Sequence, residues 1–551
     1  MNPETQMPPS RFPFFRRCFR AVFSRKMLYA SVILITLIAL FYAEENYRGQ
    51  RAWESYRKDA EARGVKLDYA AHIPPPVPDA ENGANTPLIQ SWFIRPKSDD
   101  TNAWAELRRQ ETNQWPTKHS LATGKITIKR RTKGNGSQDD RFLTDFVAWQ
   151  QAFARLKEPK DKDAKPIVRN SHGPRLDGPE QAKAAVAVLE ELKVYEPALV
   201  ELRAMSKRSK VHFPITYKPD EPFSILLPHL AKVKGIVQTL SLRACAELAV
   251  GQTNQAFETI QLMFWVCDSI KDEPFLISQL VRINGRQIMT QPIWEGITEQ
   301  KWSDEHLKKF QERLLRTDFI STLNASLASE RAAGISIIQW VRNHKKRGEA
   351  MGIFEWAESD SGEKFIADKT SANIVGWFIP TGWFHFEMAN YGLGMDDLIR
   401  DGWEAESKRV HPRVVETNDQ RVMKSFGHPN FDAVAHHYLF ARLLLPSLTR
   451  ASVRSARGQA TTYQAALACA VERYRLAHGK YPDVLTDLVP KYLAMIPHEV
   501  VSDQPMRYQR TAEGFVLYSV GWDGVDDGGA FLRTAKDSNA ETGDWVWRSA
   551  P

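Results

Sequence analysis

The clearest hydrophobic pattern in the chain is an uncharged apolar run at residues 27–43. Its seventeen positions, MLYASVILITLIALFYA, contain only Ser31 and Thr36 as clearly polar side chains. A helix rises about 1.5 Å per residue, so the run covers most of a hydrocarbon core that is about 30 Å thick. Basic residues precede it, and Glu44 and Glu45 follow it. The pattern predicts a single transmembrane helix.

The charges that flank this run predict its orientation. Residues 1–26 carry six Lys or Arg side chains and one acid, Glu4. By the positive-inside rule this tail stays in the cytoplasm, which places the bulk of the chain outside the inner, or cytoplasmic, membrane. The tail also accounts for +5 of the formal net charge of +8. The basic balance therefore reports topology and does not indicate a nucleic-acid partner.

A cleaved signal peptide is the alternative to an anchor. The 26 residues before the run are long for a signal peptide, and Phe41 stands where a small residue would be needed for cleavage after Ala43. A signal-anchor is therefore the prediction.

Beyond the membrane, residues 44–87 predict a stalk and a linker. Residues 44–66 are charged and helix-prone, so they would continue the membrane helix. Residues 72–87 contain IPPPVP, whose prolines lack N–H donors and cannot continue a helix. This stretch is either an extended linker or an arm that lies on the next domain. Residues 88–175 form a mixed region, with a short strand at 125–129 and a helix at 142–156.

Residues 176–327 predict an α-helical domain. Two of its helices, at residues 230–250 and 253–270, meet at Gly251 and carry small residues at Ala244, Ala246 and Ala256. This pair resembles a single tetratricopeptide-type hairpin, which would make an adaptor for peptides a third functional hypothesis. A recurrence of 34 residues is not evident, so a repeat array is not expected.

An aromatic-rich, mostly helical region is predicted at residues 328–445. Residues 376–395 (GWFIPTGWFHFEMANYGLGM) combine six aromatic side chains with Pro380 and several glycines. Those breakers and the charged Glu387 argue against a second membrane pass. We interpret the stretch as aromatic core beneath a loop, with a groove for an apolar or peptide ligand as the alternative.

The C-terminal region, residues 446–551, predicts a small α+β module. Apolar residues recur at helical spacing through residues 448–478, and Gly479 would end this helix. A short helix at 483–492 and two strands at 506–509 and 515–520 follow. The fold class is therefore mainly α, with one N-terminal transmembrane helix, a helical middle and this small module.

The order of residues in the module resembles the globular domain of major pseudopilins of type II secretion systems. The resemblance covers about residues 448–547 and is carried by Tyr474-Arg475, Gly479-Lys480-Tyr481-Pro482, Leu485, Leu488, Pro497, Asp503, Tyr508, Tyr518-Ser519-Val520-Gly521 and Asp523-Gly524. The apolar run lacks the family's Gly-Phe processing site and its acidic residue, so a polymerising subunit is not expected. The whole arrangement also looks like membrane-anchored exported proteins of planctomycete and verrucomicrobial bacteria.

The resemblance implies a calcium site, because the family's acidic loop binds Ca²⁺. Asp523 matches the family's first aspartate, Asp544 the later one, and Asp526 and Asp527 lie between them. Clustered carboxylates repel one another unless a cation balances them. A solvated acidic turn is the alternative.

Other candidate chemistry is sparse. The sequence contains no HExxH pair, P-loop or G-x-S-x-G elbow, so no catalytic or cofactor-binding residue is predicted. His428, Asp432 and His436 would share one face of a continuous helix, as ligands of zinc or iron can, but polar surface is the simpler interpretation. Outside the tail, Cys245, Cys267 and Cys469 are expected to be free; a pairing of the first two across a helical hairpin is the alternative.

These observations predict a non-enzymatic, membrane-anchored extracytoplasmic scaffold or binding protein of the cell envelope. Its pseudopilin-like head would link it to secretion or pilus-like machinery and to envelope protein partners. The alternative is a membrane-tethered hydrolase or metalloenzyme with its site in residues 376–440.

Overall fold

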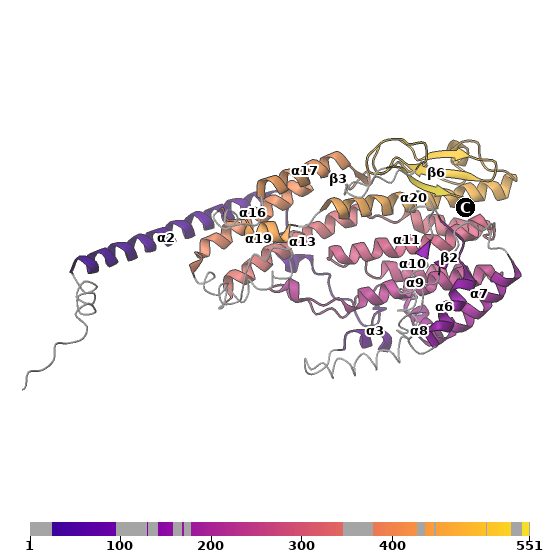
Figure 1. Cartoon of the computed structure of the whole chain (residues 1–551), viewed down its shortest axis with the longest axis horizontal. Helices are drawn as coiled ribbons and strands as arrows, with labels where there is room; N and C mark the ends of the chain where they lie inside the picture. Colours follow the sequence, from indigo (N-terminus) through magenta and orange to yellow (C-terminus); the bar gives the residue numbers. More distant parts are fainter. Residues whose placement is uncertain are drawn as a thin grey trace, which may run out of the picture. The chain divides into compact units, whose positions relative to one another are not determined.

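The computed structural model describes residues 25–94, 129–130, 141–157, 168–169, 178–344, 378–426, 436–445, 448–502, 504–530 and 543–549 (Figure 1). Contacts divide the chain into two compact units. Unit 1 comprises Met1–Val65, Ile337–Gly394 and Phe426–Leu445, and unit 2 comprises Lys66–Ser336, Met395–Ser425 and Pro446–Pro551. The predicted helical domain and the predicted C-terminal module therefore share one unit.

The described residues are mainly helical, as predicted. The helices are α2 (Arg25–Ala62), α3 (Pro87–Trp92), α6 (Phe146–Lys157), α7 (Pro179–Leu192), α8 (Glu196–Met205), α9 (Pro228–Ala249), α10 (Thr253–Asp268), α11 (Leu276–Thr298), α12 (Asp304–Leu315), α13 (Ile320–Asn343), α16 (Thr381–Ile399), α17 (Pro412–Phe426), α19 (Leu439–Leu444) and α20 (Leu448–His478). The strands are β1 (Lys129–Arg130), β2 (Val168–Arg169), β3 (Trp403–Glu404), β4 (Arg409–Val410), β5 (Arg507–Arg510), β6 (Phe515–Ser519) and β7 (Trp545–Arg548).

Helix α2 is long and apolar enough to cross a membrane, by its length and composition. None of its most apolar stretch is buried in protein, which distinguishes it from the core helix of a soluble domain. Figure 1 shows it as one continuous helix that runs on past the apolar residues. The helical continuation predicted for residues 44–66 is therefore present to Ala62, but Glu45, Gly49, Tyr56 and Ala60 are buried, so this part is packed rather than a bare stalk.

Within unit 1 the C-terminal half of α2 packs closely on α16. A Cβ atom added to Gly49 would lie 2.0 Å from the backbone oxygen of Gly382, so only glycine fits at this crossing. The Gly382 N–H donates to Asn46 Oδ1 at 2.7 Å, and the Trp383 indole donates to Glu45 Oε2 at 2.8 Å. The contact thus combines backbone proximity with buried polar pairs.

The glycines of residues 376–395 have a role different from the one predicted. We expected Gly382, Gly392 and Gly394 to break the stretch into a loop, but all three lie inside α16. Each is a place where a neighbour approaches the helix: Gly392 faces the Tyr56 ring, and Gly394 faces Leu445 and Phe426. A helix tolerates such glycines when close packing repays their propensity cost of about 1 kcal/mol each.

Unit 2 is organised around two long helices. Helix α9 packs against α7, α10 and α11, and α20 packs against α11 and α12. Helices α9 and α10 meet at Gly251, whose φ of 78° is left-handed, as a tight turn requires. Among the described cysteines, Cys245, Cys267 and Cys469 are free and buried, as predicted.

The C-terminal sheet packs on α20, beside which Figure 1 shows it. Its order is β5-β6-β7, all antiparallel, with Tyr508 opposite Leu517 and Leu517 opposite Trp547. The predicted helix at 448–478 and the hairpin through residues 513–514 are confirmed, whereas only Leu485–Leu488 of the predicted helix at 483–492 is helical. Strand β7 was not predicted.

We expect Gly49→Leu to loosen unit 1, because the new side chain would overlap the Gly382 backbone. Overpacking of this kind costs about 1–3 kcal/mol or more. Hydrogen–deuterium exchange of the full-length protein should show faster exchange in α16. The matched control is Arg51→Leu, an exposed position on the same helix. Equal exchange in both variants would contradict the close contact.

Candidate metal centre in the acidic loop

The acidic loop joins β6 to β7 and is shaped by glycines. Gly521, Gly524, Gly528, Gly529 and Gly543 all have left-handed φ values, between 67° and 91°. Side chains other than glycine rarely adopt this conformation, so the Gly-rich sequence is what allows the chain to fold back on itself here. The loop thereby brings together the four predicted ligands, Asp523, Asp526, Asp527 and Asp544, which span twenty-two positions.

Two of the four aspartates use their oxygens to hold the loop. Asp523 accepts hydrogen bonds from the backbone N–H groups of Val525 at 3.1 Å and Gly543 at 3.0 Å. Asp526 accepts from the Gly528 N–H at 3.0 Å and from Arg507 Nε at 2.7 Å. These carboxylates are already satisfied without a cation.

The other two aspartates have buried oxygens without a partner. Asp544 is fully buried, and its Oδ2 accepts from the Gly529 N–H at 2.7 Å. Its Oδ1 and the Oδ2 of Asp527 are buried and have no hydrogen-bond partner among the described residues. An unsatisfied buried acceptor costs about 1–3 kcal/mol, so these two atoms are where a cation or a proton would be most favourable.

The charge state of Asp544 reflects this environment. Burial raises its pKa from 3.8 to about 6, the N–H groups of Gly529 and Asp527 oppose the rise, and the nearby carboxylates of Asp527 and Asp526 add to it. Near pH 6 the carboxyl group is therefore half protonated, and above pH 6 the loop holds an uncompensated buried charge.

Basic and acidic side chains support the base of the loop. Arg507 on β5 donates to both Asp526 and Glu499. The distance from Arg507 Nη1 to Glu499 Oε2 is 3.4 Å. Glu499 is fully buried and accepts from the Val520 N–H. The Trp522 indole donates to Glu416 Oε1 at 2.7 Å. Glu499 and Arg507 were not predicted, since nothing in their spacing connects them to the loop.

The four predicted ligands thus divide into two pairs. Ca²⁺ takes six to eight oxygen ligands at about 2.3–2.6 Å. Asp527 and Asp544 have oxygens to offer, whereas Asp523 and Asp526 are engaged elsewhere. In the described part of the chain, no three His, Cys, Asp or Glu side chains already converge as metal ligands. A cation would have to complete its shell with backbone carbonyls of the loop.

The residues of the alternative site, 376–440, are only partly described. His428 and Asp432 lie outside the described residues, while His436 and His437 form a turn before α19 rather than part of a helix. Glu387 accepts the backbone N–H groups of Leu439, Phe440 and Ala441 at 2.6–3.1 Å. Burial raises the pKa of Glu387 to about 8, although these three donors oppose the shift.

His385 and Glu387, two positions apart on α16, form hydrogen bonds with different parts of unit 1. His385 contacts Arg342, whereas Glu387 caps α19. Both contacts lie within unit 1. Residues two apart point to different sides of a helix, so these two side chains do not form a common site.

Comparison with known proteins returns no relative. No family model matches the chain, no curated protein matches it, and no solved structure matches it. The function of this protein therefore has to be argued from its own residues.

We expect Asp544→Asn to have opposite effects with and without Ca²⁺. Because the pKa of Asp544 is higher in the folded state, protonation of this carboxyl group favours folding. This contribution is fully present below the unfolded pKa of 3.8 and is lost as the pH rises through the folded pKa of about 6. At pH 7.5 in chelator, the amide should therefore raise Tm by roughly 2–4 °C. Adding Ca²⁺ should raise the Tm of the wild-type protein at pH 7.5 but not at pH 5, and should leave the variant unchanged.

The matched control for this experiment is Asp220→Asn, at an exposed position in unit 2. It should respond to Ca²⁺ as the wild type does. A Ca²⁺ response that survives Asp544→Asn would show that the loop is not the site.

Proposed function

We propose that this protein is a membrane-anchored extracytoplasmic binding protein whose C-terminal head docks on other proteins of the envelope. The observation that carries the proposal is α2: its apolar stretch is exposed except for the half-buried Tyr42, and the later part of the same helix packs within unit 1. Such a helix is suited to hold a folded domain at a membrane surface. The six basic residues before the apolar run at 27–43 favour a cytoplasmic N-terminus.

The head in this proposal is α20 with the sheet β5-β6-β7 and the acidic loop. The sequence of this region resembles a pseudopilin globular domain, and its long helix, small antiparallel sheet and Gly-rich acidic loop are the elements that the resemblance implies. We propose that Ca²⁺ binds Asp527 and Asp544 and stiffens the loop. The link to secretion or pilus-like machinery rests on the resemblance and is part of the proposal.

The packing of the head constrains how it would act. Helix α20 contacts α11 and α12 along its length, and the backbone oxygens of Arg548 and Ser549 accept hydrogen bonds from Trp294 at 2.6 Å and Thr298 at 2.8 Å. The head is thus built into unit 2 and would present its loop as part of that unit. A free-standing fragment is not the form in which it should be tested.

Affinity purification from native membranes tests the partner. The tagged full-length protein, extracted in mild detergent, should enrich components of a secretion or pilus-like system over a control anchored by residues 1–66 alone. Asp544→Asn or a chelator should reduce this enrichment if the loop contacts the partner. Enrichment of other envelope proteins would remove the secretion link, and an absence of any enriched protein would overturn the binding role.

Protease accessibility tests the orientation. Proteinase K added to intact spheroplasts should digest unit 2, because the proposal places it outside the cytoplasmic membrane. A tag fused before residue 25 should stay protected until the membrane is opened with detergent. Protection of unit 2 in intact spheroplasts would reverse the proposed topology.

A further inference from the structure

A cavity of about 680 Å³ lies in unit 2, away from the acidic loop. Its walls are residues 71–77, residues 209–212 and the end of α10 with the turn after it, including Trp265, Asp268 and Lys271. The proline-rich stretch is therefore an arm on the helical domain, one of the two arrangements expected from the sequence. The volume lies within the range of about 300–1,000 Å³ that is usual for small-molecule sites.

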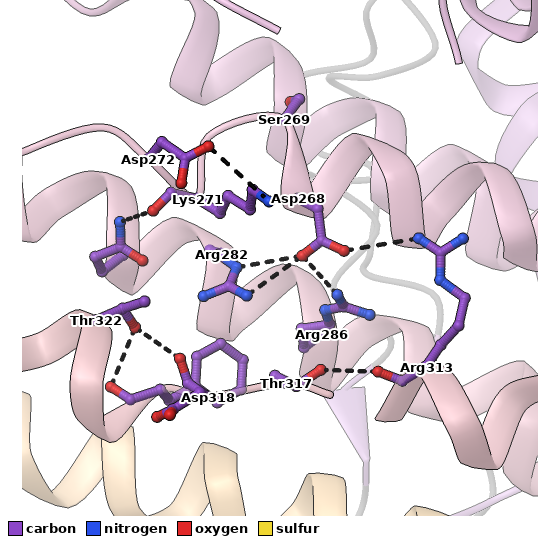
Figure 2. A network of polar contacts seen from close by, with 12 residues as sticks. Asp268, Ser269, Lys271, Asp272, Arg282, Arg286, Arg313, Thr317, Asp318 and Thr322 are labelled. Atoms are coloured by element: carbon purple, nitrogen blue, oxygen red, sulfur yellow. Dashed lines mark hydrogen bonds and ion pairs between the residues drawn. The ribbon is translucent and has the colours of Figure 1, made fainter. Parts of the chain in front are cut away.

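Three arginines meet one carboxylate at the wall of this cavity. Asp268 ends α10, and its Oδ1 accepts from Arg286 Nη2 at 2.6 Å and from Arg282 Nη2 at 3.3 Å. Its Oδ2 lies 3.7 Å from Arg313 Nη2. Figure 2 shows the three guanidinium groups around Asp268, from α11 and α12.

This cluster holds more positive charge than Asp268 neutralises. Arg282 and Arg286 are only 5% and 3% exposed, and guanidinium groups stay protonated in proteins. Arg282 Nη1 and both Nε and Nη1 of Arg286 have no hydrogen-bond partner among the described residues. Rings of Phe319 and Phe264 lie under the guanidinium groups and stabilise the charge only in part.

The carboxylate of Asp268 is therefore a poor ligand for a cation. Burial would raise its pKa, but Arg286, Arg282 and Arg313 outweigh that effect and lower it. The Asp268 side chain is 28% exposed and lines the cavity. The three arginines on its other side more than balance its negative charge. The arginines are not among the residues that line the cavity, so they would act on a ligand there only through their charge behind Asp268.

The rim of the cavity adds two ammonium groups. Lys210 pairs with Glu81 at 3.1 Å and Lys271 with Asp272 at 4.0 Å, and all four side chains are at least half exposed. Exposed pairs of this kind are worth about 0–1 kcal/mol, so either lysine can turn to a ligand at little cost. Among the lining side chains, the two lysines balance Asp268 and Asp272. The three arginines behind Asp268, less Glu81 beside Lys210, bring the local balance to +2.

The remaining wall is mixed. The half-buried Trp265 and three consecutive prolines, at positions 74–76, provide its rigid apolar surface, and His72, His212, Ser209 and Ser269 provide polar groups. Indole and pyrrolidine rings are rigid, so they lose little conformational entropy when they contact a ligand. This surface suits a planar or short apolar group rather than an inorganic ion alone.

We propose that this cavity binds a small organic carboxylate with a planar apolar body. The carboxylate would lie towards Lys210 and Lys271 in the field of the arginine cluster, and the apolar body would lie between Trp265 and the proline arm. This site is separate from the acidic loop and does not depend on the binding role proposed above.

The test is ¹⁹F NMR of the full-length protein in detergent, titrated with 4-fluorobenzoate. The neutral isostere 4-fluorobenzamide has the same shape without the charge. The acid should bind with a Kd in the millimolar range expected of a ten-atom probe, and at least about tenfold more tightly than the amide. Micelles without protein measure partition of each probe into detergent.

Charge-reversal variants locate the binding. Lys210→Glu combined with Lys271→Glu should weaken binding of 4-fluorobenzoate at least about tenfold and leave that of the amide unchanged. The matched control combines Lys193→Glu with Lys218→Glu, two exposed lysines that also pair with a glutamate but lie outside the cavity wall. Equal binding of acid and amide, equal loss in both double variants, or no binding of the acid would each overturn the proposal.

Discussion

The structure depends on a constraint at its N-terminal helix: the apolar face of α2 cannot stay in water. Nearly every large apolar side chain between Met27 and Phe41 is about half exposed or more. Leaving such a side chain in water costs about 1.5–3 kcal/mol, and a bilayer removes this cost. The same helix runs without a break to Ala62 and contacts α16 through Gly49 and Gly382. A membrane that held the apolar stretch would therefore also restrict the part of unit 1 that packs on this helix.

Three carboxylates are compensated in different ways in this protein. Glu387 accepts backbone N–H groups of α19, the partly buried Asp268 is contacted by three arginines, and Asp544 has only backbone N–H groups near it and one buried oxygen without a partner among the described residues. The first arrangement is complete within the protein. The second carries surplus positive charge and the third surplus negative charge, so these two places are where ligands of opposite sign would gain the most. Charge balance, more than cavity size, distinguishes the candidate sites.

Much of the helical architecture could be predicted from the sequence, because α2 contains a continuous apolar run, Gly251 separates α9 from α10, and α20 has apolar periodicity and ends before Gly479. The exact course of α20 and the hairpin of β5 and β6 follow from such local signals. The prediction for the glycines of α16 was wrong, since the sequence alone does not distinguish a glycine that ends a helix from one that allows a neighbouring segment to pack closely. The acidic residues of the loop could be named in advance because most of them are close in the sequence. The partners of Asp268 could not, because they lie 14 to 45 positions away on other helices.

Strand β7 contributes large side chains to a core whose other residues come from much earlier in the sequence. Trp545 and Trp547 join the same hydrophobic cluster as Ala84 and Val188, and Trp294 donates its indole N–H to the backbone of Arg548, 254 positions away. The interior of unit 2 is therefore complete only once β7 has been synthesised, 254 positions after Trp294. A chain that stops before β7 would lack two of the largest side chains in this interior and would expose apolar surface, which favours aggregation.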